Sequence, residues 1–336
     1  MTMLRSTAPS CRWLAGTVVL AVAMSLATPT VSGYQLVRGL EFAWAPELRP
    51  VGYWVANAGS HWLTVDQVVT ETRAAFDAWQ ESEAMGLELS YRGKTNQRPF
   101  DFFDATNTVG FSTPERMAQL GLSQVTLAVT SWVSAIGRGV IAESDILVNP
   151  SYTWTDIPDS GFWDLRATLV HEAGHFLGLG HSGVGRVGDS GLVAGSSVMW
   201  PYTFGRGSSL GRILTADDVT GAAVLYPSPE APTGSIRGAI HRDSGERVRY
   251  AHVVAYEPLR DLTVGAWADG EGNYEIAGLP NGRYLLRVNP IPAHHSDGAY
   301  FFPYGQTDRD FSVTVVAQFA LVSNGQATEI NIEVLP

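Results

Sequence analysis

Apolar positions recur at helical intervals soon after residue 60. Residues 64–67, Thr-Val-Asp-Gln, have the spacing of a capping box, in which side chains satisfy the backbone N–H groups at a helix start. The positions that then share one helical face are Val65, Val68, Val69, Thr72, Phe76 and Trp79. This pattern predicts a long amphipathic helix that begins beside Thr64.

Shorter apolar segments follow this helix. Three of them have the length and composition of strands, at residues 87–91, 125–129 and 145–148. Leu165, Leu169 and Phe176 then give a second helical segment an apolar face. Thr215 and Asp218 have the spacing to open a further helix. The first two thirds of the chain therefore predict a mixture of helices and strands.

The last third of the chain has a different pattern. Strand-like runs alternate with Gly, Asp and Asn turns, at residues 236–240, 251–256, 263–268, 274–276, 284–288, 311–316 and 329–334. Before them, residues 227–234 read Pro-Ser-Pro-Glu-Ala-Pro-Thr-Gly, which is the composition of a linker. We expect an all-β domain that can be separated from the first domain at this linker.

One segment carries metal-binding chemistry, and it reads His-Glu-Ala-Gly-His-Phe-Leu-Gly-Leu-Gly-His from residue 171 to residue 181. On a helix, His171 and His175 lie on one face and can present two imidazoles to one ion. Gly178 can take a left-handed conformation that ends the helix and brings His181 to the same ion. Three nitrogen ligands leave a fourth position for water, which is typical of catalytic zinc. Glu172 projects at another angle and is placed to act as general base.

This spacing resembles the metzincin signature H-E-x-x-H-x-x-G-x-x-H, which is followed in that clan of zinc proteases by a methionine-containing turn. Residues 197–201, Ser-Val-Met-Trp-Pro, are the candidate turn. The resemblance implies that Met199 packs beneath the three imidazoles, and ordinary core filling is the alternative. Ser182, Pro201 and residues 214–226 are similar to the matrixin branch of the clan.

The matrixin resemblance covers roughly residues 42–227 and implies a fold, a metal and an activity. The implied fold is zincin-like, with a mixed sheet and three helices around a cleft, so the chain as a whole is α+β. The implied metal is one catalytic zinc held by His171, His175 and His181. The implied activity is that of a zinc metalloendopeptidase, a hydrolase whose partner is a polypeptide substrate.

The chain departs from the matrixin pattern in ways that limit this inference. The segment between His181 and Met199 is longer than in the vertebrate enzymes and rich in glycine. Thr203 stands where a tyrosine often lines the S1′ pocket, so substrate preference cannot be carried over. The chain has eight histidines, too few for the additional structural zinc of vertebrate matrixins. The only cysteine, Cys11, cannot block the zinc from a propeptide if it lies in a leader that is removed.

Acidic residues near the predicted helices have more than one possible role. Asp156, Asp159 and Asp164 could offer oxygen ligands to calcium, which is common in matrixins, but helix capping and solvation are the favoured interpretation. Asp217 and Asp218 are expected to support the start of the last helix through capping and the helix dipole.

The C-terminal segment has a resemblance of its own. Residues 234–238, 269–274 and 278–284 resemble turns of carboxypeptidase regulatory-like modules, which are transthyretin-type β-sandwiches. A stabilising or spacing role, binding of a surface or substrate, and assistance in secretion all stay open for this domain. The pair His294-His295 is predicted to lie in a solvated loop, since adjacent residues of an extended segment point to opposite sides.

The N-terminus and the overall charge indicate an exported protein. Arg5 and Arg12 precede an apolar stretch at residues 14–27 and small residues at 31–33, as in a secretory leader. An uncleaved anchor is the alternative, but the stretch is short for a membrane span. We therefore predict a signal peptide at 1–33, a catalytic domain at 34–228 and a β-sandwich at 229–336.

Composition narrows the partners and the location. The net charge is −11, which argues against nucleic-acid binding. Once the leader is removed, the mature chain has no cysteine and so no disulfide, which fits a bacterial-type secreted protein. We expect a monomer without a membrane span, located outside the cell, at its surface or in the periplasm.

Two functions of different classes fit these observations. The first is a secreted zinc endopeptidase that hydrolyses extracellular proteins, in which Glu172 takes a proton from water and returns it to the leaving amine. The second is a non-catalytic binding or adhesion protein that is built on the zincin fold and acts through its β-sandwich. Loss of Glu172 or of a histidine would indicate the second class. None is lost, so the enzyme is favoured.

Overall fold

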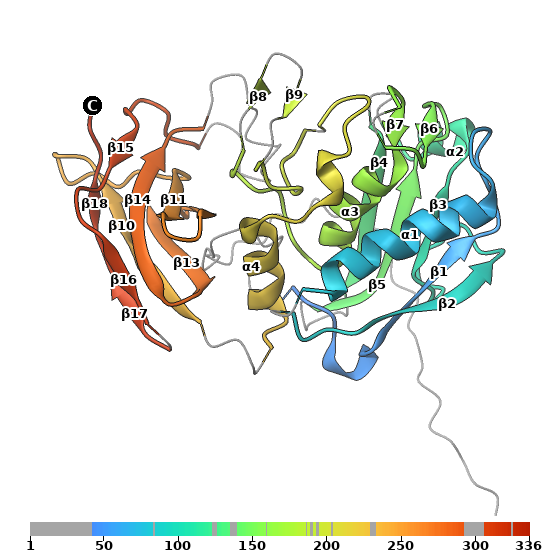
Figure 1. Ribbon diagram of the computed structural model, residues 1–336, viewed down its shortest axis with the longest axis horizontal. Helices are drawn as coiled ribbons and strands as arrows, with labels where there is room; N and C mark the ends of the chain where they lie inside the picture. Colours follow the sequence, from blue (N-terminus) through green and yellow to red (C-terminus); the bar gives the residue numbers. More distant parts are fainter. Residues whose placement is uncertain are drawn as a thin grey trace, which may run out of the picture.

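The computed structural model describes residues 42–82, 85–122, 126–134, 140–158, 160–185, 187–188, 191–192, 195–202, 204–228, 233–291, 306–323 and 325–336. The predicted leader, Asp159, Thr203 and the pair His294-His295 lie outside these residues. Two large hydrophobic cores form within them, one from residues 42–226 and one from residues 236–334, beside a small third cluster of Phe100, Met117 and Leu147. Figure 1 shows a helix-containing part and a β-rich part side by side.

The first core is built on a mixed sheet with the strand order β2-β1-β3-β5-β4. The strands are β1 (Val51–Ala56), β2 (Leu89–Thr95), β3 (Thr108–Phe111), β4 (Ala128–Ser134) and β5 (Ile141–Val148). Strands β2, β1, β3 and β5 pair in parallel, whereas β4 is antiparallel to β5 and lies at an edge of the sheet. The mixed sheet predicted from the sequence is confirmed.

Two central strands are absent from the sequence prediction for a physical reason. Strand β3 has four residues, all of them buried, and β1 is also mostly buried. Interior parallel strands lack the alternation of polar and apolar residues that marks a half-exposed strand. The three predicted strands of this part overlap β2, β4 and β5, but their bounds differ by several residues because pairing with neighbours sets where a strand ends.

Four α-helices occur in the described residues: α1 (Val65–Gln80), α2 (Pro114–Gln119), α3 (Leu165–Phe176) and α4 (Ala216–Leu225). The sequence predicted three helices, and the short α2 is the additional one. The capping boxes predicted at Thr64 and Thr215 are both formed. Two short 3-10 helices, η1 (Pro46–Leu48) and η2 (Leu210–Arg212), and two small ribbons complete this part. The ribbons pair β6 (Trp154–Thr155) with β7 (Trp163–Asp164), and β8 (Val187–Gly188) with β9 (Gly191–Leu192).

Helix α3 ends inside the protein, where its last carbonyl groups have no helical partners. The indoles of Trp132 and Trp44 donate to the carbonyls of the last two helical residues, at 2.7 and 2.9 Å. The hydroxyl of Tyr226 donates to the carbonyl of the next residue at 2.6 Å. These donors from three separate segments fix the end of α3.

The second core lies between two sheets. One sheet contains β10 (Gly234–His241), β13 (Asn273–Leu279), β17 (Ala327–Glu329) and β18 (Ile332–Glu333). The other contains β11 (His252–Glu257), β12 (Leu262–Trp267), β14 (Gly282–Asn289), β15 (Thr314–Val315) and β16 (Ala320–Val322). Ile236 and Ile276 from the first sheet share a core with Val253 and Leu286 from the second. The predicted all-β sandwich is confirmed, with β16 and β17 added.

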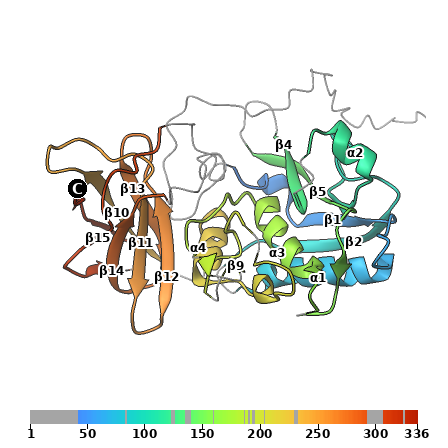
Figure 2. The same ribbon diagram turned by 90° about the horizontal axis from the view of Figure 1, so that it is seen from above.

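The two parts of the molecule are in contact. Helix α4 packs against β12 and β13, and Figure 2 shows it between α3 and the strands of the sandwich. The linker composition did not predict this contact. No helix in the described segments has the length and apolar character needed to cross a bilayer.

Candidate metal centre

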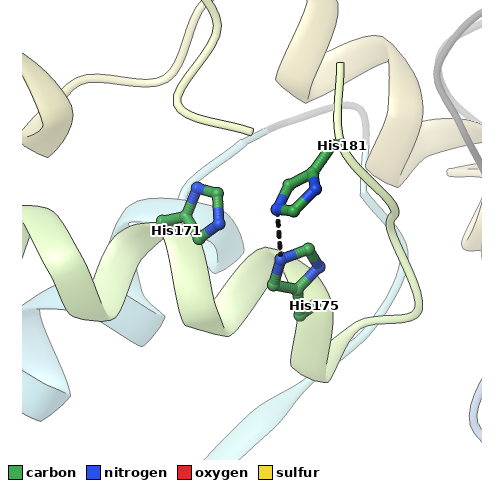
Figure 3. A group of neighbouring side chains, drawn as sticks. All are labelled: His171, His175 and His181. Atoms are coloured by element: carbon green, nitrogen blue, oxygen red, sulfur yellow. Dashed lines mark hydrogen bonds between the residues drawn. The ribbon is translucent and has the colours of Figure 1, made fainter. Parts of the chain in front are cut away.

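Three histidines converge at the end of helix α3. Each of His171, His175 and His181 contributes one ring nitrogen, and these nitrogens all lie within 4.8 Å of one another. Figure 3 shows the first two on consecutive turns of α3 and the third on the chain that returns above the helix. The Nε2 atoms of His175 and His181 are 3.2 Å apart. The structure thus brings together the three residues that the spacing singled out.

The imidazoles are oriented so that a cation fits between them. Nδ1 of His171 lies 2.6 Å from the carbonyl oxygen of Val198, and Nδ1 of His175 lies 2.7 Å from that of Leu179. A carbonyl only accepts, so Nδ1 of each ring carries the proton and Nε2 is left with its lone pair. Converging imidazole nitrogens of this kind suit zinc.

Burial keeps the central histidine uncharged. Burial, followed by the neighbouring rings of His171 and His181, lowers the pKa of His175 well below its ordinary value. A neutral imidazole is the form that binds a metal. The site is therefore prepared for a cation over the neutral pH range.

The turn that carries His181 depends on Gly178. This residue has a φ of +101° and ends the helix in the left-handed region, as predicted. A Cβ atom at this position would also overlap the backbone carbonyl of Phe42. The chain can therefore reverse toward the metal centre only with glycine here.

Glu172 lies beside the triad and is 5% exposed. The hydroxyl of Thr130 on β4 donates to its Oε2 at 2.6 Å. Burial raises the pKa of Glu172, while His171 and the hydrogen bond from Thr130 oppose that rise. Thr130 was not predicted as a site residue. Nothing in the sequence around it indicates that its hydroxyl donates to a carboxylate 42 residues away.

Met199 lies directly against helix α3. It is 2% exposed, and a Cβ atom at Gly174 would overlap its sulfur. Gly174 stands between the two helical histidines in sequence, so the thioether occupies space that opens only because this residue lacks a side chain. Trp79 fills the same space from helix α1, where a Cβ at Gly174 would lie 2.8 Å from its ring.

Asp218 holds the turn around Met199 as well as the start of α4. Its carboxylate accepts from the backbone N–H and the hydroxyl of Thr215, at 2.8 and 2.7 Å, which confirms the predicted cap. It also accepts from the hydroxyl of Ser197 and from the N–H groups of Val198 and Met199. The second set of contacts was not predicted, and it ties the last helix to the turn that supports His171.

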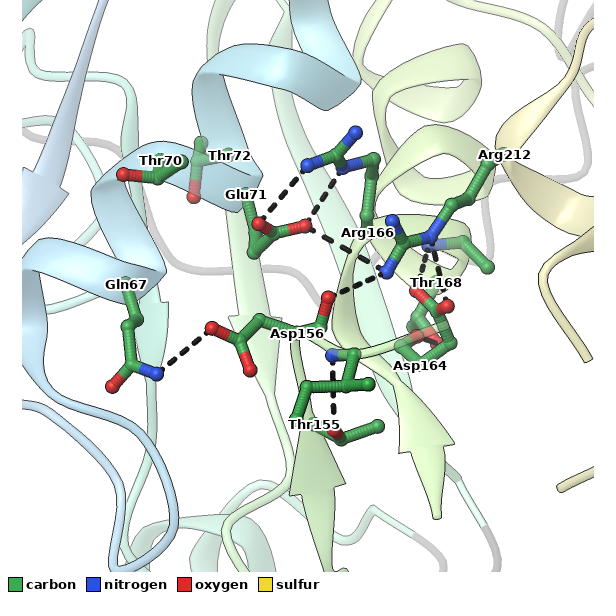
Figure 4. Close-up of polar contacts among 12 residues, drawn as sticks. Gln67, Thr70, Glu71, Thr72, Thr155, Asp156, Asp164, Arg166, Thr168 and Arg212 are labelled. Carbon is green, nitrogen blue, oxygen red and sulfur yellow. Dashed lines mark hydrogen bonds and ion pairs between the residues drawn. The ribbon is translucent and has the colours of Figure 1, made fainter. Parts of the chain in front are cut away.

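The acidic residues before α3 are engaged with protein partners (Figure 4). Asp164 caps α3 by accepting from the N–H of Ala167 at 2.9 Å, and it also pairs with Arg212 at 2.8 Å. Asp156 accepts from the amide of Gln67 at 2.8 Å. Capping is therefore the observed role of Asp164. The described acids form no cluster with the spacing of a metal site.

A cleft of about 730 Å³ opens beside the histidines. Residues 126–130, which lead into edge strand β4 and form its start, make one wall, and residues 200–202 form part of another. Other aromatic lining residues are Trp132, Tyr152, Trp163 and Phe204. The lining includes all three histidines and Glu172, so a ligand in the cleft would contact the metal centre.

A mixed five-stranded sheet, a helix with two histidines and a glycine turn that returns a third define a metzincin-type protein. The sequence profile of the matrixin family matches residues 43–227, more than half of the chain. The chain therefore belongs to the matrixin family, the metallopeptidases expected from the sequence.

Several solved structures match about a third of the chain. They include a Bacteroides uniformis protein provisionally assigned as carbohydrate-binding, at 19% identity, covering 31% of this chain and 42% of that one with a TM-score of 0.22. The Bacillus anthracis TIE protein matches at 17% identity, covering 31% and 16%, with a TM-score of 0.22. The major pilin subunit of Bacillus cereus matches at 16% identity, covering 31% and 30%, with a TM-score of 0.22. The matches span less than half of each of these proteins. The search among curated proteins gave no match.

Proposed function

We propose that the protein is a secreted zinc endopeptidase that cleaves polypeptides in an extended conformation. One observation carries the proposal: one ring nitrogen from each of the three histidines lies within 4.8 Å of the others, and these residues line a cleft together with the buried carboxyl group of Glu172. Zinc bound there would act as a Lewis acid on the scissile carbonyl.

Glu172 is the group we assign to proton transfer. Thr130 occupies Oε2, so Oε1 is the oxygen left to take a proton from the attacking water and return it to the leaving amine. Burial raises the pKa of Glu172 above its ordinary value, which makes its carboxylate a stronger base.

Edge strand β4 is suited to hold the substrate. It lies at the margin of the sheet and its residues 128–130 line the cleft, so an extended peptide can add to it by backbone hydrogen bonds. This arrangement would place a scissile bond beside the histidines. The aromatic walls then offer apolar surface to substrate side chains.

The proposed export rests on the leader-like residues 1–33, and the substrate is then an extracellular polypeptide. A binding protein on the same fold is the competing function. Every group needed for hydrolysis is present in the site, which supports the enzyme.

Metal removal tests the proposal. The purified mature protein should cleave an unstructured polypeptide, lose activity when a chelator removes the metal, and regain it with Zn²⁺. Metal analysis of each sample is the necessary control. Full activity after verified metal removal would refute a zinc mechanism, and a zinc-loaded protein without activity on a peptide library would favour the binding function.

A further inference from the structure

The contact between the two parts of the molecule is centred on a buried carboxyl group. Asp217, in the first turn of α4, is 1% exposed. Its Oδ2 accepts from the hydroxyl of Ser182 at 2.6 Å, and its Oδ1 accepts from the N–H of Gly265 on strand β12 at 2.8 Å. One side chain thus joins the residue next to His181 to the β-sandwich.

Ser182 is also tied to the turn that follows the histidines. Its N–H donates to the carbonyl of Met199 at 2.8 Å, and its hydroxyl accepts from the N–H of Val184 at 2.9 Å. The direction in which the chain leaves His181 is therefore fixed by three contacts, and one of them leads through Asp217 to Gly265.

Beside the hydrogen bonds of Asp217, the chain that follows His181 packs closely against the β-sandwich. A Cβ atom at Gly183 would lie 2.5 Å from the ring of Trp267 and 2.8 Å from that of His252. A Cβ atom at Gly265 would overlap Nε2 of His252. The rings of His252 and Trp267 lie 4.5 Å apart and are themselves buried. Glycine on both sides is what allows this close approach.

Separating the sandwich would leave a polar group without its partner. Burial and the neighbouring Asp218 raise the pKa of Asp217 to about 8, and no cationic group pairs with it among the described residues. A buried carboxyl oxygen that loses its donor costs free energy, so the structure around it would rearrange. Ser182, which donates to the same carboxyl group, would carry that rearrangement to the chain beside His181.

We propose that the β-sandwich is a positioning element of the metal centre, acting from Gly265 through Asp217 and Ser182 on the third histidine. The inference rests on the proposed zinc ligation, but not on peptidase activity. It assigns to the sandwich a role that a spacer or a separate binding module would not have. Residues that orient metal ligands typically change metal affinity by about 10- to 100-fold when replaced.

The test is Gly265→Ala in the full-length mature chain, because this change is made on the sandwich side of the contact. The added methyl group would lie 2.3 Å from Nε2 of His252 and 2.6 Å from a methyl group of Val184 across the contact, so β12 should move away from Asp217. We expect zinc affinity, measured by competition with a chromophoric chelator, to fall by about 10-fold or more. The matched control is Gly270→Ala in the turn after β12, where the nearest atom is the hydroxyl of Tyr250 at 3.0 Å.

A second set of variants covers the case in which Gly265→Ala does not fold. Asp217→Ala removes the hydrogen bonds of Asp217 with Ser182 and with Gly265. Ser182→Ala removes the hydrogen bond between Ser182 and Asp217. Both variants should therefore bind zinc more weakly. Asp217→Asn keeps an acceptor for Gly265 and offers a donor to Ser182, so it should restore affinity toward that of the parent protein. Asp217→Leu has a similar volume but no polar atoms, so it should not restore affinity. Rescue by asparagine and not by leucine would separate hydrogen bonding from space filling.

The outcomes separate this inference from the proposed function. Parental zinc affinity in a folded Gly265→Ala protein, or in Asp217→Ala, would overturn the positioning role. A parent protein that binds zinc but cleaves nothing would overturn the proposed function. A loss of affinity in Gly265→Ala would then still support the positioning role.

Discussion

His175 and His252 are both buried, and burial lowers the pKa of both, yet their surroundings differ. Nε2 of His175 points to a place where two other imidazole nitrogens converge. Nε2 of His252 lies at the domain contact, and among the described residues it has no hydrogen-bond partner. Burial alone therefore does not make a site. A metal centre also requires lone pairs that meet at one point and second nitrogens that are held by the backbone.

The polar groups around the two histidines differ in the same way. At the metal centre Thr130 donates to one oxygen of Glu172, and the side chain of Glu172 lines the cleft. At the domain contact both oxygens of Asp217 are already engaged by donors from the protein. The first arrangement is prepared for an external ligand, and the second holds two parts of the chain together.

The largest effect is expected at the metal centre from Glu172→Gln. The change removes the proposed base and keeps all three histidines, so turnover should fall by at least ~10²-fold. Zinc content, determined by metal analysis, should stay at the parental level. His175→Ala is the contrasting variant and should lose the metal. Parental turnover in Glu172→Gln would show that another group moves the proton.

A smaller effect is expected from Thr130→Val, which removes the hydroxyl at nearly constant volume. The charge-assisted hydrogen bond to Glu172 is then lost, so kcat should fall by about 10-fold, with little change in KM. Thr130→Ser should restore most of the activity.

The double variant shows whether Thr130 acts through Glu172. In a Glu172→Gln background, Thr130→Val should have little further effect on kcat. An equal loss in both backgrounds would mean that the valine disturbs the cleft by another route.

At the domain contact we expect a change in acid stability. Burial, followed by the charge of Arg287, lowers the pKa of His252 to about 3. Its value in the unfolded chain is about 6.5. Below that pH the unfolded chain binds a proton that the folded chain does not. The free energy of unfolding therefore falls as the pH drops from about 6.5 toward 3, by up to about 1.4 kcal/mol per pH unit.

His252→Leu should remove this contribution and give a shallower loss of stability over the same pH range. Denaturant unfolding of both proteins at several pH values measures the difference, and groups common to the two proteins cancel. Identical slopes would mean that the pKa of His252 is the same in the folded and the unfolded protein. The comparison with His175 would then fail.

Local spacing made much of the helical part predictable. The capping boxes at Thr64 and Thr215 and the left-handed Gly178 involve residues within a few positions of one another, and the structure has all three. The short buried strand β3 was missed because its sequence carries little pattern of its own. Helix α2 has a local start signal, with Thr113 as cap and Pro114 at its first position, but it is only 6 residues long and was also missed. Their formation depends on neighbours that pair with them or cover them.

The sequence by itself determined the donor set of the metal centre. Positions four apart share a helical face, and a glycine can reverse the chain, so His171, His175 and His181 follow from covalent geometry. The tertiary structure decided what surrounds them. Thr130 reaches Glu172 across 42 residues, and Gly265 reaches Asp217 across 48. Such pairs form only when separate elements pack together, and no local pattern of residues encodes which donor will meet which acceptor.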